Sequence, residues 1–237
     1  INTVEKIDMF LNKLYRLRKI KKIIINKLKD ILLKRGALQP RILITGGSKA
    51  EEDQKQTIDN ATAIVRTHAM DYDRYLEEKI DSNCSSLTPK EPYAVFLDSE
   101  ICHHPDFMLQ DANPHCKEEK YYPEINNFFN HFSLQNRLQV VIAIHPRSDL
   151  SFQKKLFQGR EVINNKLAAV VKKAEVVLTH SSTAINFAVL YKKPLILIDS
   201  DNYNKNFRRR VKPYENYLGA KTINITHKHF IKLNEVV

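Results

Sequence analysis

The chain of 237 residues is long enough for one large or two small domains, and its 43% hydrophobic residues suffice for a core, which excludes a disordered protein. No apolar run approaches the roughly 18 residues of a membrane-spanning helix, no signal peptide is visible, and three cysteines without a CxxC pair indicate a reducing compartment. Much of the net charge of +11 comes from residues 1–35, where eleven Lys or Arg outnumber three Asp or Glu; a nucleic-acid-binding body would spread its charge over the binding face, so we expect no nucleic-acid partner.

Residues 1–36 carry the pattern of a basic amphipathic helix. Between residues 3 and 35, apolar side chains recur every three or four positions with lysines between them, and Gly36 and Pro40 end the pattern. One interpretation places this helix on an anionic membrane surface, which would be its partner. The alternative packs the apolar face on the domain and leaves the lysines in solvent. Both stay open.

Residues 37–92 are predicted to hold part of a first α/β domain and a linker. Arg41–Thr45 is a predicted strand, and the Gly46-Gly47 pair after it is followed by no GxGxxG or GKS pattern, so it predicts neither a dinucleotide site nor a P-loop. A second short strand is predicted over Ala61–Arg66. Asn, Ser, Thr and two prolines in residues 80–92 are typical of a linker, and we place the domain boundary there.

The segment after the second strand contains a candidate general base. His68, Asp71 and Asp73 lie within six residues of one another, and a carboxylate or imidazole in such a place can accept a proton. The alternative for Asp71 is a cap on the predicted helix Tyr72–Lys79.

Two further carboxylates follow the predicted buried strand Tyr93–Leu97. Asp98 and Glu100 stand at the carboxyl end of that strand, and in a parallel sheet this end faces the ligand crevice. They are therefore candidates for a general base or for binding a hydroxyl group. The alternative is the start of a solvated loop.

The next loop contains residue types that bind metals, namely Cys102, His103, His104, His115 and Cys116. Their spacing fits no familiar zinc site, and only two prolines stiffen the intervening segment. We therefore expect no structural metal.

Residues 139–198 form the centre of the predicted fold. Val140–Ile144 and Val176–Leu178 are continuously apolar, which indicates strands that are buried on both faces of a parallel sheet. The predicted helix Tyr121–Phe132, opened by Pro123, would be the crossover into the first of them. Further predicted elements are helices at 163–173 and 184–191 and strands at Leu195–Ile198 and Thr222–Ile225.

Polar residues follow these two central strands. The first strand ends at His145, which Pro146 and Arg147 follow, and the second leads through His180 to Ser181-Ser182-Thr183. Imidazole, guanidinium and hydroxyl groups donate hydrogen bonds to phosphate, and N–H groups at the start of the next helix attract anions. We predict a nucleotide or phosphate pocket here. Taken singly, the alternatives are a helix cap and a histidine with an ordinary polar partner.

His145-Pro146 lies about 35 residues ahead of Ser181-Ser182, and this pair resembles the HP and serine motifs of bacterial sialyltransferases, polysialyltransferases and capsule Kdo transferases. The wider run FLDSE…HHPDF…YYPEINNFF…VVIAIHPRSD…FQGR…VLTHSSTAINFAVLYKKPLILI, within residues 62–200, also resembles proteins of bacterial capsule and O-antigen loci. In the GT-B enzymes of these families, the two motifs hold the CMP part of a CMP-sugar. The acidic-acidic-glycine motif that carries the base in several sialyltransferases is absent, so the resemblance does not identify the base.

The resemblance implies an α/β, GT-B-like fold. Residues 93–237 would form a Rossmann-like parallel-sheet domain that binds a nucleotide sugar, and residues 37–92 would be part of a second α/β domain whose remainder we expect this chain to lack. His145, Pro146, Arg147, Ser181, Ser182 and Thr183 would then bind the nucleotide, and Asp71, Asp98 or Glu100 would supply the base.

The implied function is that of a metal-independent glycosyltransferase that needs no cofactor. Its substrates would be a nucleotide sugar, a CMP-sugar by the resemblance, and a bacterial surface polysaccharide or lipid-linked glycan. It would work in the cytoplasm, on the inner face of the membrane. The alternatives are a nucleotide-sugar epimerase, a glycerophosphate transferase, or a non-catalytic nucleotide-sugar-binding subunit of a capsule assembly machine.

Overall fold

The computed structural model describes residues 20, 21, 23–28, 31, 32, 40–54, 58, 60–80, 89–104, 106–109, 112–227 and 231–235. The chain divides into two compact units, Ile1–Ala69 and Met70–Val237. Among the described residues, no helix combines the length and the apolar character that crossing a bilayer requires.

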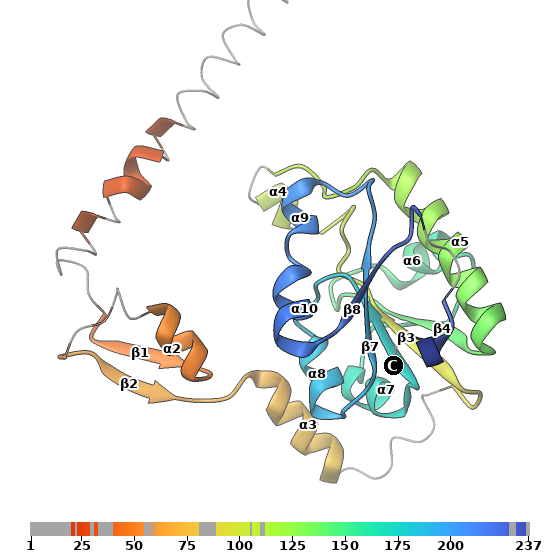
Figure 1. The fold of residues 1–237 in the computed structure, drawn as a ribbon, viewed down its shortest axis with the longest axis horizontal. Coiled ribbons are helices and arrows are strands. Elements are labelled where there is room, and N and C mark those ends of the chain that lie inside the picture. Colours follow the sequence, from red (N-terminus) through yellow and green to blue (C-terminus); the bar gives the residue numbers. More distant parts are fainter. Residues whose placement is uncertain are drawn as a thin grey trace, which may run out of the picture. The chain divides into compact units, whose positions relative to one another are not determined.

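Six strands of the larger unit form one parallel sheet (Figure 1). They are β3 (Tyr93–Leu97), β4 (Gln139–Ala143), β5 (Val162–Ile163), β6 (Val176–Thr179), β7 (Leu195–Asp199) and β8 (Lys221–Asn224). Their order across the sheet is β5-β4-β3-β6-β7-β8. Counted from β3, this is the 3-2-1-4-5-6 order of a Rossmann sheet, and it confirms the predicted Rossmann-like fold. The order reverses between β3 and β6.

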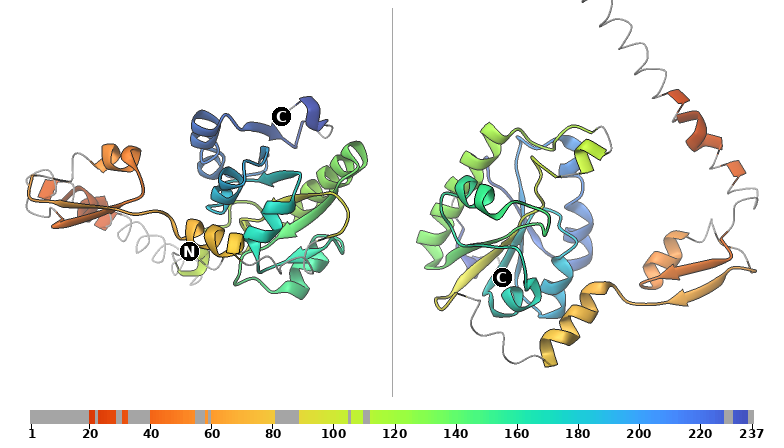
Figure 2. Two further views of the ribbon diagram at one scale, coloured as in Figure 1. Left: turned by 90° about the horizontal axis from the view of Figure 1, so that it is seen from below. Right: turned by 180° about the vertical axis from the view of Figure 1, so that it is seen from behind.

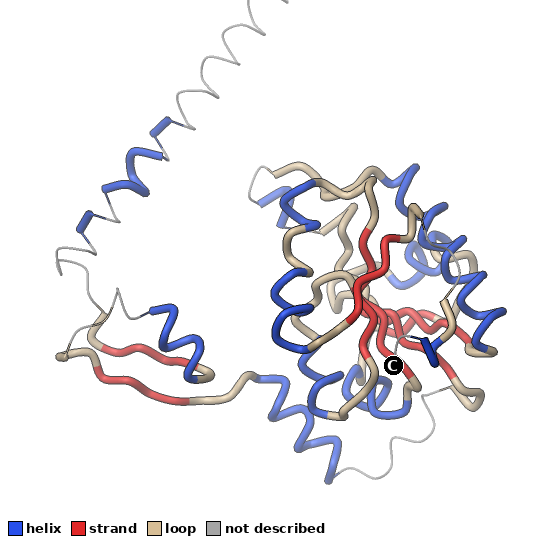
Figure 3. The backbone as a smooth tube through the Cα atoms, in the orientation of Figure 1, coloured by secondary structure: helices blue, strands red, loops and turns tan. Residues whose placement is uncertain are grey.

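Helices of the larger unit flank the sheet (Figure 3). They are α3 (Met70–Ile80), α4 (Asp106–Leu109), α5 (Glu118–Asn136), α6 (Leu150–Leu156), α7 (Leu167–Lys173), α8 (Ile185–Leu190), α9 (Lys205–Arg208), α10 (Lys212–Leu218) and the short 3-10 helix η2 (Leu233–Glu235). A second set of views shows the same strands between helices (Figure 2).

The two faces of the sheet have separate cores because successive side chains of a strand point to opposite faces. In β3, Ala94 and Phe96 pack with the apolar face of α5, whereas Val95 packs with α7 and α8. All five residues of β3 are buried, as the continuous apolar run predicted. The central strands therefore owe their stability to burial on both faces.

Helix α5 differs from its prediction at both ends. It runs from Glu118 to Asn136, so Pro123 lies inside it rather than at its start. Glu118 and Glu119 in the first turn suit the positive end of the helix dipole, and they extend the helix before the proline. The helix ends at Arg137, which adopts a left-handed conformation with φ 53°.

Strand β5 was not predicted, and a helix was predicted from residue 163 instead. The strand has two residues, too few to leave a periodic pattern, and α7 begins at Leu167. Lys166 caps α7 with φ 52°, a left-handed conformation that ends the loop after the strand.

The smaller unit contains the predicted pair of strands. β1 (Ile42–Thr45) and β2 (Ala63–Arg66) pair in parallel, and α2 (Ser48–Gln54) connects them, with an ion pair of 2.7 Å between Arg66 Nε and Glu51 Oε1. Much of the predicted amphipathic helix lies outside the described residues. Those that are described within it are helical. Most of their large apolar side chains are exposed, namely Ile20, Ile23, Ile24, Ile25, Leu28 and Ile31, whereas Leu32 is half-buried.

Helix α3 belongs to the larger unit, whereas the boundary expected at residues 80–92 placed it with the smaller one. The reason lies in its contacts with α8. Asp71 accepts a hydrogen bond of 2.8 Å from Asn186, and the rings of Tyr75 and Tyr191 lie 4.9 Å apart. Nothing in the sequence of α3 indicates these partners, because they lie far away along the chain.

Candidate functional site

A pocket of about 400 Å³ opens where the strand order reverses. In parallel sheets a ligand binds outside the carboxyl ends of the strands at this point. Residues that follow three of the strands form one wall, namely Asp98, Ser99, His145, Ser181, Ser182 and Thr183. The rest of the lining consists of His104, Asp106, Phe107, Ala112, His115, Phe207 and Arg210. The fold thus brings the HP and serine motifs together in one cavity.

The remaining predicted residues lie elsewhere. Pro146 and Asp71 line a separate hollow of about 430 Å³ beside α3. Arg147 is exposed, with its guanidinium 3.7 Å from the carboxylate of Asp106. Glu100 is buried, and its Oε1 accepts a hydrogen bond of 3.3 Å from Gln153. Of the three candidate carboxylates, all of which the structure describes, Asp98 is the one that lines the switch-point pocket.

Three histidines line the pocket, and the partner of each ring fixes where its proton lies. Nδ1 of His145 accepts from the backbone N–H of Arg147 at 3.2 Å, and Nδ1 of His104 accepts from the backbone N–H of Asp106 at 3.2 Å. A neutral imidazole whose Nδ1 accepts a hydrogen bond carries its proton on Nε2. Both rings therefore have an Nε2–H donor.

His115 has the same tautomer for a different reason. Its Nδ1 lies 2.9 Å from the side-chain nitrogen of Asn204, while the oxygen of that amide accepts from the N–H of Phe207 at 2.9 Å. Because the oxygen caps α9, the amide nitrogen must face His115 and donate to it. All three rings of this three-histidine array, His104, His115 and His145, thus carry Nε2–H donors.

Burial keeps two members of the array uncharged near neutral pH. It lowers the pKa of His145, with smaller contributions from the neighbouring His104 and Arg147. It also lowers the pKa of His115 to about 4, helped by the positive charge of Arg210 and by His104. The rings therefore act as neutral donors, and Arg210 supplies a permanent positive charge in the pocket wall.

Several of the helix amides predicted to bind phosphate are engaged within the chain. Helix α8 begins only at Ile185, and the N–H groups of Ile185 and Phe187 donate to the carbonyls of Ser182 and Ala184 at 3.2 and 3.1 Å. The N–H of Ala184 donates to Ser182 Oγ at 3.3 Å. Ser181 Oγ, by contrast, is buried without a hydrogen-bond partner among the described residues. Side chains are therefore the main donors for an anion.

Asp98 is the buried carboxyl of the pocket, with 5% of its surface exposed. Its Oδ1 accepts from the N–H of Glu100 at 3.0 Å, and its Oδ2 has no partner among the described residues. Burial first, and then the charge of Glu100, raises the pKa of Asp98 to about 7. A general base that works near neutral pH needs a pKa in this range.

Behind Asp98 lies a histidine whose role sequence reasoning missed. His180 is fully buried, and its Nε2 is 3.0 Å from Tyr121 Oη, which in turn is 3.5 Å from Asp98 Oδ1. The signal in the sequence was a histidine that directly follows the wholly buried strand β6. The sequence indicates His104 and His115 only as possible metal ligands, because their place in the pocket depends on the fold of the loop.

The cysteines and histidines of this loop do not converge on one point. Burial raises the pKa of both Cys102 and Cys116, the latter to about 11, so both are thiols in the core. His103 Nε2 pairs with Glu118 at 3.0 Å. Across the part of the chain that the structure describes, no group of three or more His, Cys, Asp or Glu is arranged to hold a metal ion.

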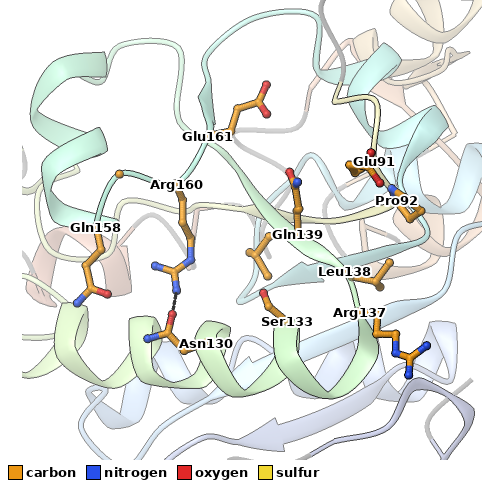
Figure 4. A pocket seen from close by; sticks show the side chains of 12 residues that line it. Glu91, Pro92, Asn130, Ser133, Arg137, Leu138, Gln139, Gln158, Arg160 and Glu161 are labelled. Atoms are coloured by element: carbon orange, nitrogen blue, oxygen red, sulfur yellow. Dashed lines mark hydrogen bonds between the residues drawn. The ribbon is translucent and has the colours of Figure 1, made fainter.

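A larger hollow of about 640 Å³ lies at the amino-terminal edge of the sheet (Figure 4). Arg160 stands in it, but its guanidinium donates to Asn126 Oδ1 at 2.6 Å and to Asn130 Oδ1, so it ties the β5 loop to α5. Figure 4 shows the arginine directed at this helix. The hollow is at the end of the strands opposite to the switch point, so the switch-point pocket is the candidate site.

No protein-family model matches the chain, and no curated protein matches it. Among solved structures, it is similar to the glycotransferase of kitacinnamycin, with 17% identity and a TM-score of 0.35 over 62% of this chain and 35% of that one. It is also similar to the glycosyltransferase SnogD from Streptomyces nogalater, with 14% identity and a TM-score of 0.37 over 75% of this chain and 49% of that one. The chain therefore spans less than half the length of either.

Proposed function

We propose that this chain transfers a glycosyl group from a CMP-sugar to a hydroxyl group of a glycan. The observation that carries the proposal is that His145, Ser181 and Ser182, from two motifs that resemble those of CMP-sugar transferases, line one pocket at the switch point of a Rossmann sheet. The same pocket is also lined by His104, His115 and Arg210.

The donor phosphate would lie against the three-histidine array. Transfer breaks the bond between the anomeric carbon and a phosphate oxygen, and the electron pair stays on that oxygen. Nε2–H groups of His145 and His115 stabilise the developing charge, as does the hydroxyl of Ser181, because donors fixed in advance need no reorganisation during the reaction. Such stabilisation of the leaving group requires no metal.

Asp98 would act as the general base. The acceptor oxygen attacks the anomeric carbon while its proton passes to the Asp98 carboxylate, whose Oδ2 has no partner among the described residues. Glu100 and Asp71 are already engaged with Gln153 and Asn186, which makes them the weaker candidates.

The acceptor we propose is a bacterial surface polysaccharide or a lipid-linked glycan, with the enzyme on the inner face of the membrane. The basic amino-terminal segment supports this proposal. Ile20, Ile24 and Leu28 share one helical face by their spacing, and they are 51%, 59% and 56% exposed. A face of this kind, with lysines around it, suits an anionic lipid surface.

Isothermal titration with CMP, CDP, UDP and GDP tests the nucleotide, and CMP is expected to bind most tightly. Asp98→Asn should keep CMP binding and lose donor hydrolysis and transfer, whereas Asp73→Asn on the exposed side of α3 should keep all three. Binding of CMP without turnover of any donor would indicate a binding subunit instead. Failure to bind CMP would contradict the proposal at its first step.

A further inference from the structure

The hydrogen bonds around His180 can run in one direction only. Nδ1 of His180 lies 3.0 Å from the carbonyl oxygen of Ile198, and a carbonyl accepts but never donates. Nδ1 must therefore carry the proton of the neutral ring, which leaves a lone pair on Nε2. Tyr121 Oη is 3.0 Å from Nε2, so the Tyr121 hydroxyl donates a hydrogen bond to His180.

This direction has a consequence for Asp98. The Tyr121 hydroxyl has a single proton. Because this proton is directed at His180, it cannot also form a hydrogen bond to Asp98 Oδ1, which lies 3.5 Å from Tyr121 Oη. The carboxyl then has only backbone donors, the N–H of Glu100 at 3.0 Å and that of Ser99, although it is almost wholly buried. A buried carboxylate with so few donors strongly favours its protonated form.

Other groups around Asp98 do not replace the missing donor. Tyr122 Oη and Asp98 Oδ2 each have no hydrogen-bond partner among the described residues, and Glu100 adds negative charge nearby. The titratable and charged groups that surround Asp98, counting both the core side and the pocket side, are Glu100, Cys102, Tyr121, Tyr122, His180, His104, Asp106, His115, His145 and Arg210.

We propose that His180 is a positioning residue of the site. It accepts the single hydrogen bond that the Tyr121 hydroxyl can donate, so Asp98 does not receive that bond and keeps a high proton affinity. The pair of His180 and Tyr121 thus sets the proton affinity of Asp98 without touching the ligand. The importance of this affinity for transfer rests on the proposed function, in which Asp98 is the base, but the hydrogen-bond arrangement does not.

The titration of both groups agrees with this arrangement. Burial lowers the pKa of His180 to about 4, so the ring stays neutral, and able to accept from Tyr121, over the whole range in which Asp98 titrates. Burial raises the pKa of Tyr121 well above its usual value, so its hydroxyl keeps the proton that it donates.

The His180 ring also has a steric role that a phenyl group can fill. It lies in an aromatic cluster, with ring centroids 5.3 Å from Phe96, 5.1 Å from Tyr203 and 5.9 Å from Phe207. A His180→Phe variant therefore keeps the packing and removes the acceptor. Tyr121 is then free to donate to Asp98.

The test is a carbon-13 NMR titration of the aspartate carboxyl groups in the ligand-free protein, with the Asp98 signal identified by its loss in Asp98→Asn. In the wild type, where Tyr121 does not donate to Asp98, the Asp98 midpoint is expected at or above its raised pKa of about 7. In His180→Phe, the freed hydroxyl stabilises the carboxylate and should lower the midpoint by about one to two pH units. The double variant Tyr121→Phe/His180→Phe lacks the hydroxyl and should restore the wild-type midpoint.

Tyr121→Phe alone provides a second test that removes one oxygen atom and leaves His180 in place. Because the Tyr121 proton does not serve Asp98 in the wild type, its midpoint should move by less than about half a pH unit. A larger rise, or an unchanged midpoint in a folded His180→Phe, would overturn the proposal. Neither measurement involves a sugar donor, so the result is independent of whether the chain proves to be a glycosyltransferase.

Discussion

The imidazole rings of His104 and His145 lie edge to face with their centroids 5.1 Å apart. One ring comes from the loop after β3 and the other from the tip of β4, two strands that are neighbours in the sheet. Each ring has its Nδ1 bonded to the N–H of the residue two positions later. The same local turn thus fixes both rings with their Nε2 protons available in one pocket.

Substitution of His145 tests this tautomer. In the side chain of glutamine, the amide nitrogen reaches about the position of Nε2, whereas that of asparagine reaches Nδ1. His145→Ala and His145→Asn should each lose a hydrogen bond to the phosphate, about 1.5–3 kcal/mol or roughly ten- to hundredfold in CMP affinity. His145→Gln should retain more of it. Isothermal titration at neutral pH measures all three.

The control for this series is His131→Ala, which removes a half-buried histidine of α5 that is not among the residues lining the pocket. Its CMP affinity should equal that of the wild type. Equal affinities of the Gln and Asn variants of His145 would show that Nε2 is not the donor.

The raised pKa of Asp98 also predicts how stability depends on pH. In the unfolded chain the carboxyl has its ordinary pKa of 3.8, and in the folded protein about 7. The folded state therefore binds more protons between these values, so the contribution of Asp98 is full below about pH 4 and is lost as the pH rises through about 7. Asp98→Asn removes this dependence.

Urea denaturation at about pH 4 and about pH 8 measures this dependence. Relative to the wild type, the free energy of unfolding of Asp98→Asn should be higher by a few kcal/mol at about pH 8 than at about pH 4. Asp53→Asn, at an exposed position of the smaller unit, is the matched control and should follow the wild-type curve. A constant difference between Asp98→Asn and the wild type at both pH values would mean that Asp98 is not perturbed.

Sequence patterns predicted the strands that are local apolar runs, and they missed features of the site that depend on residues far apart in the chain. β3, β4, β6 and β7 were predictable because each is a continuous apolar segment that parallel sheets bury on both faces. The neutral, buried state of His180 was not, since it results from rings that come from β3, α5 and α9. Sequence also gave no sign that Ser182 Oγ and nearby carbonyls accept hydrogen bonds from the first amides of α8.

The core beneath the pocket depends on α5, and Phe129→Ala tests its contribution. Phe129 is fully buried, with its ring centroid 5.0 Å from that of Phe96 in β3. Its removal should cost about 3–5 kcal/mol, because the transfer free energy of the ring is lost and a cavity remains. Leu134→Ala, on the same helix but 82% exposed, should change stability by less than about 0.5 kcal/mol. Urea unfolding of both variants measures the difference.

The amino-terminal segment predicts a salt-dependent membrane affinity. The protein should sediment with anionic liposomes at low salt and be released at high salt, because screening weakens the attraction of lysines to the surface. Replacing Arg18, Lys19, Lys21 and Lys22 by Gln should abolish sedimentation. The control replaces four exposed lysines of the larger unit by Gln, namely Lys154, Lys155, Lys205 and Lys212. Equal loss in both variants would assign the effect to net charge rather than to this segment.

The last prediction concerns Glu124 of α5, which joins the loops after β7 and β8. Its Oε2 accepts from Ser200 Oγ at 2.6 Å, and its Oε1 accepts from Thr226 Oγ1 at 2.8 Å and from Asn202 Nδ2 at 3.1 Å. Three donors thus converge on one carboxylate. Glu124→Gln replaces one acceptor oxygen with an NH₂ group that must face a donor.

This variant should therefore lose about 1–3 kcal/mol in the free energy of unfolding, the usual result of leaving a partly buried donor unpaired. The damage should extend to the site, because Tyr203, in the loop that Ser200 begins, lies with its ring centroid 5.1 Å from that of His180. Urea denaturation measures the stability, and the Asp98 midpoint from NMR reports whether the site is disturbed. Glu119→Gln, an exposed carboxylate of the same helix, should change neither. If Glu124→Gln is as stable as Glu119→Gln, the three hydrogen bonds of Glu124 contribute no net stability.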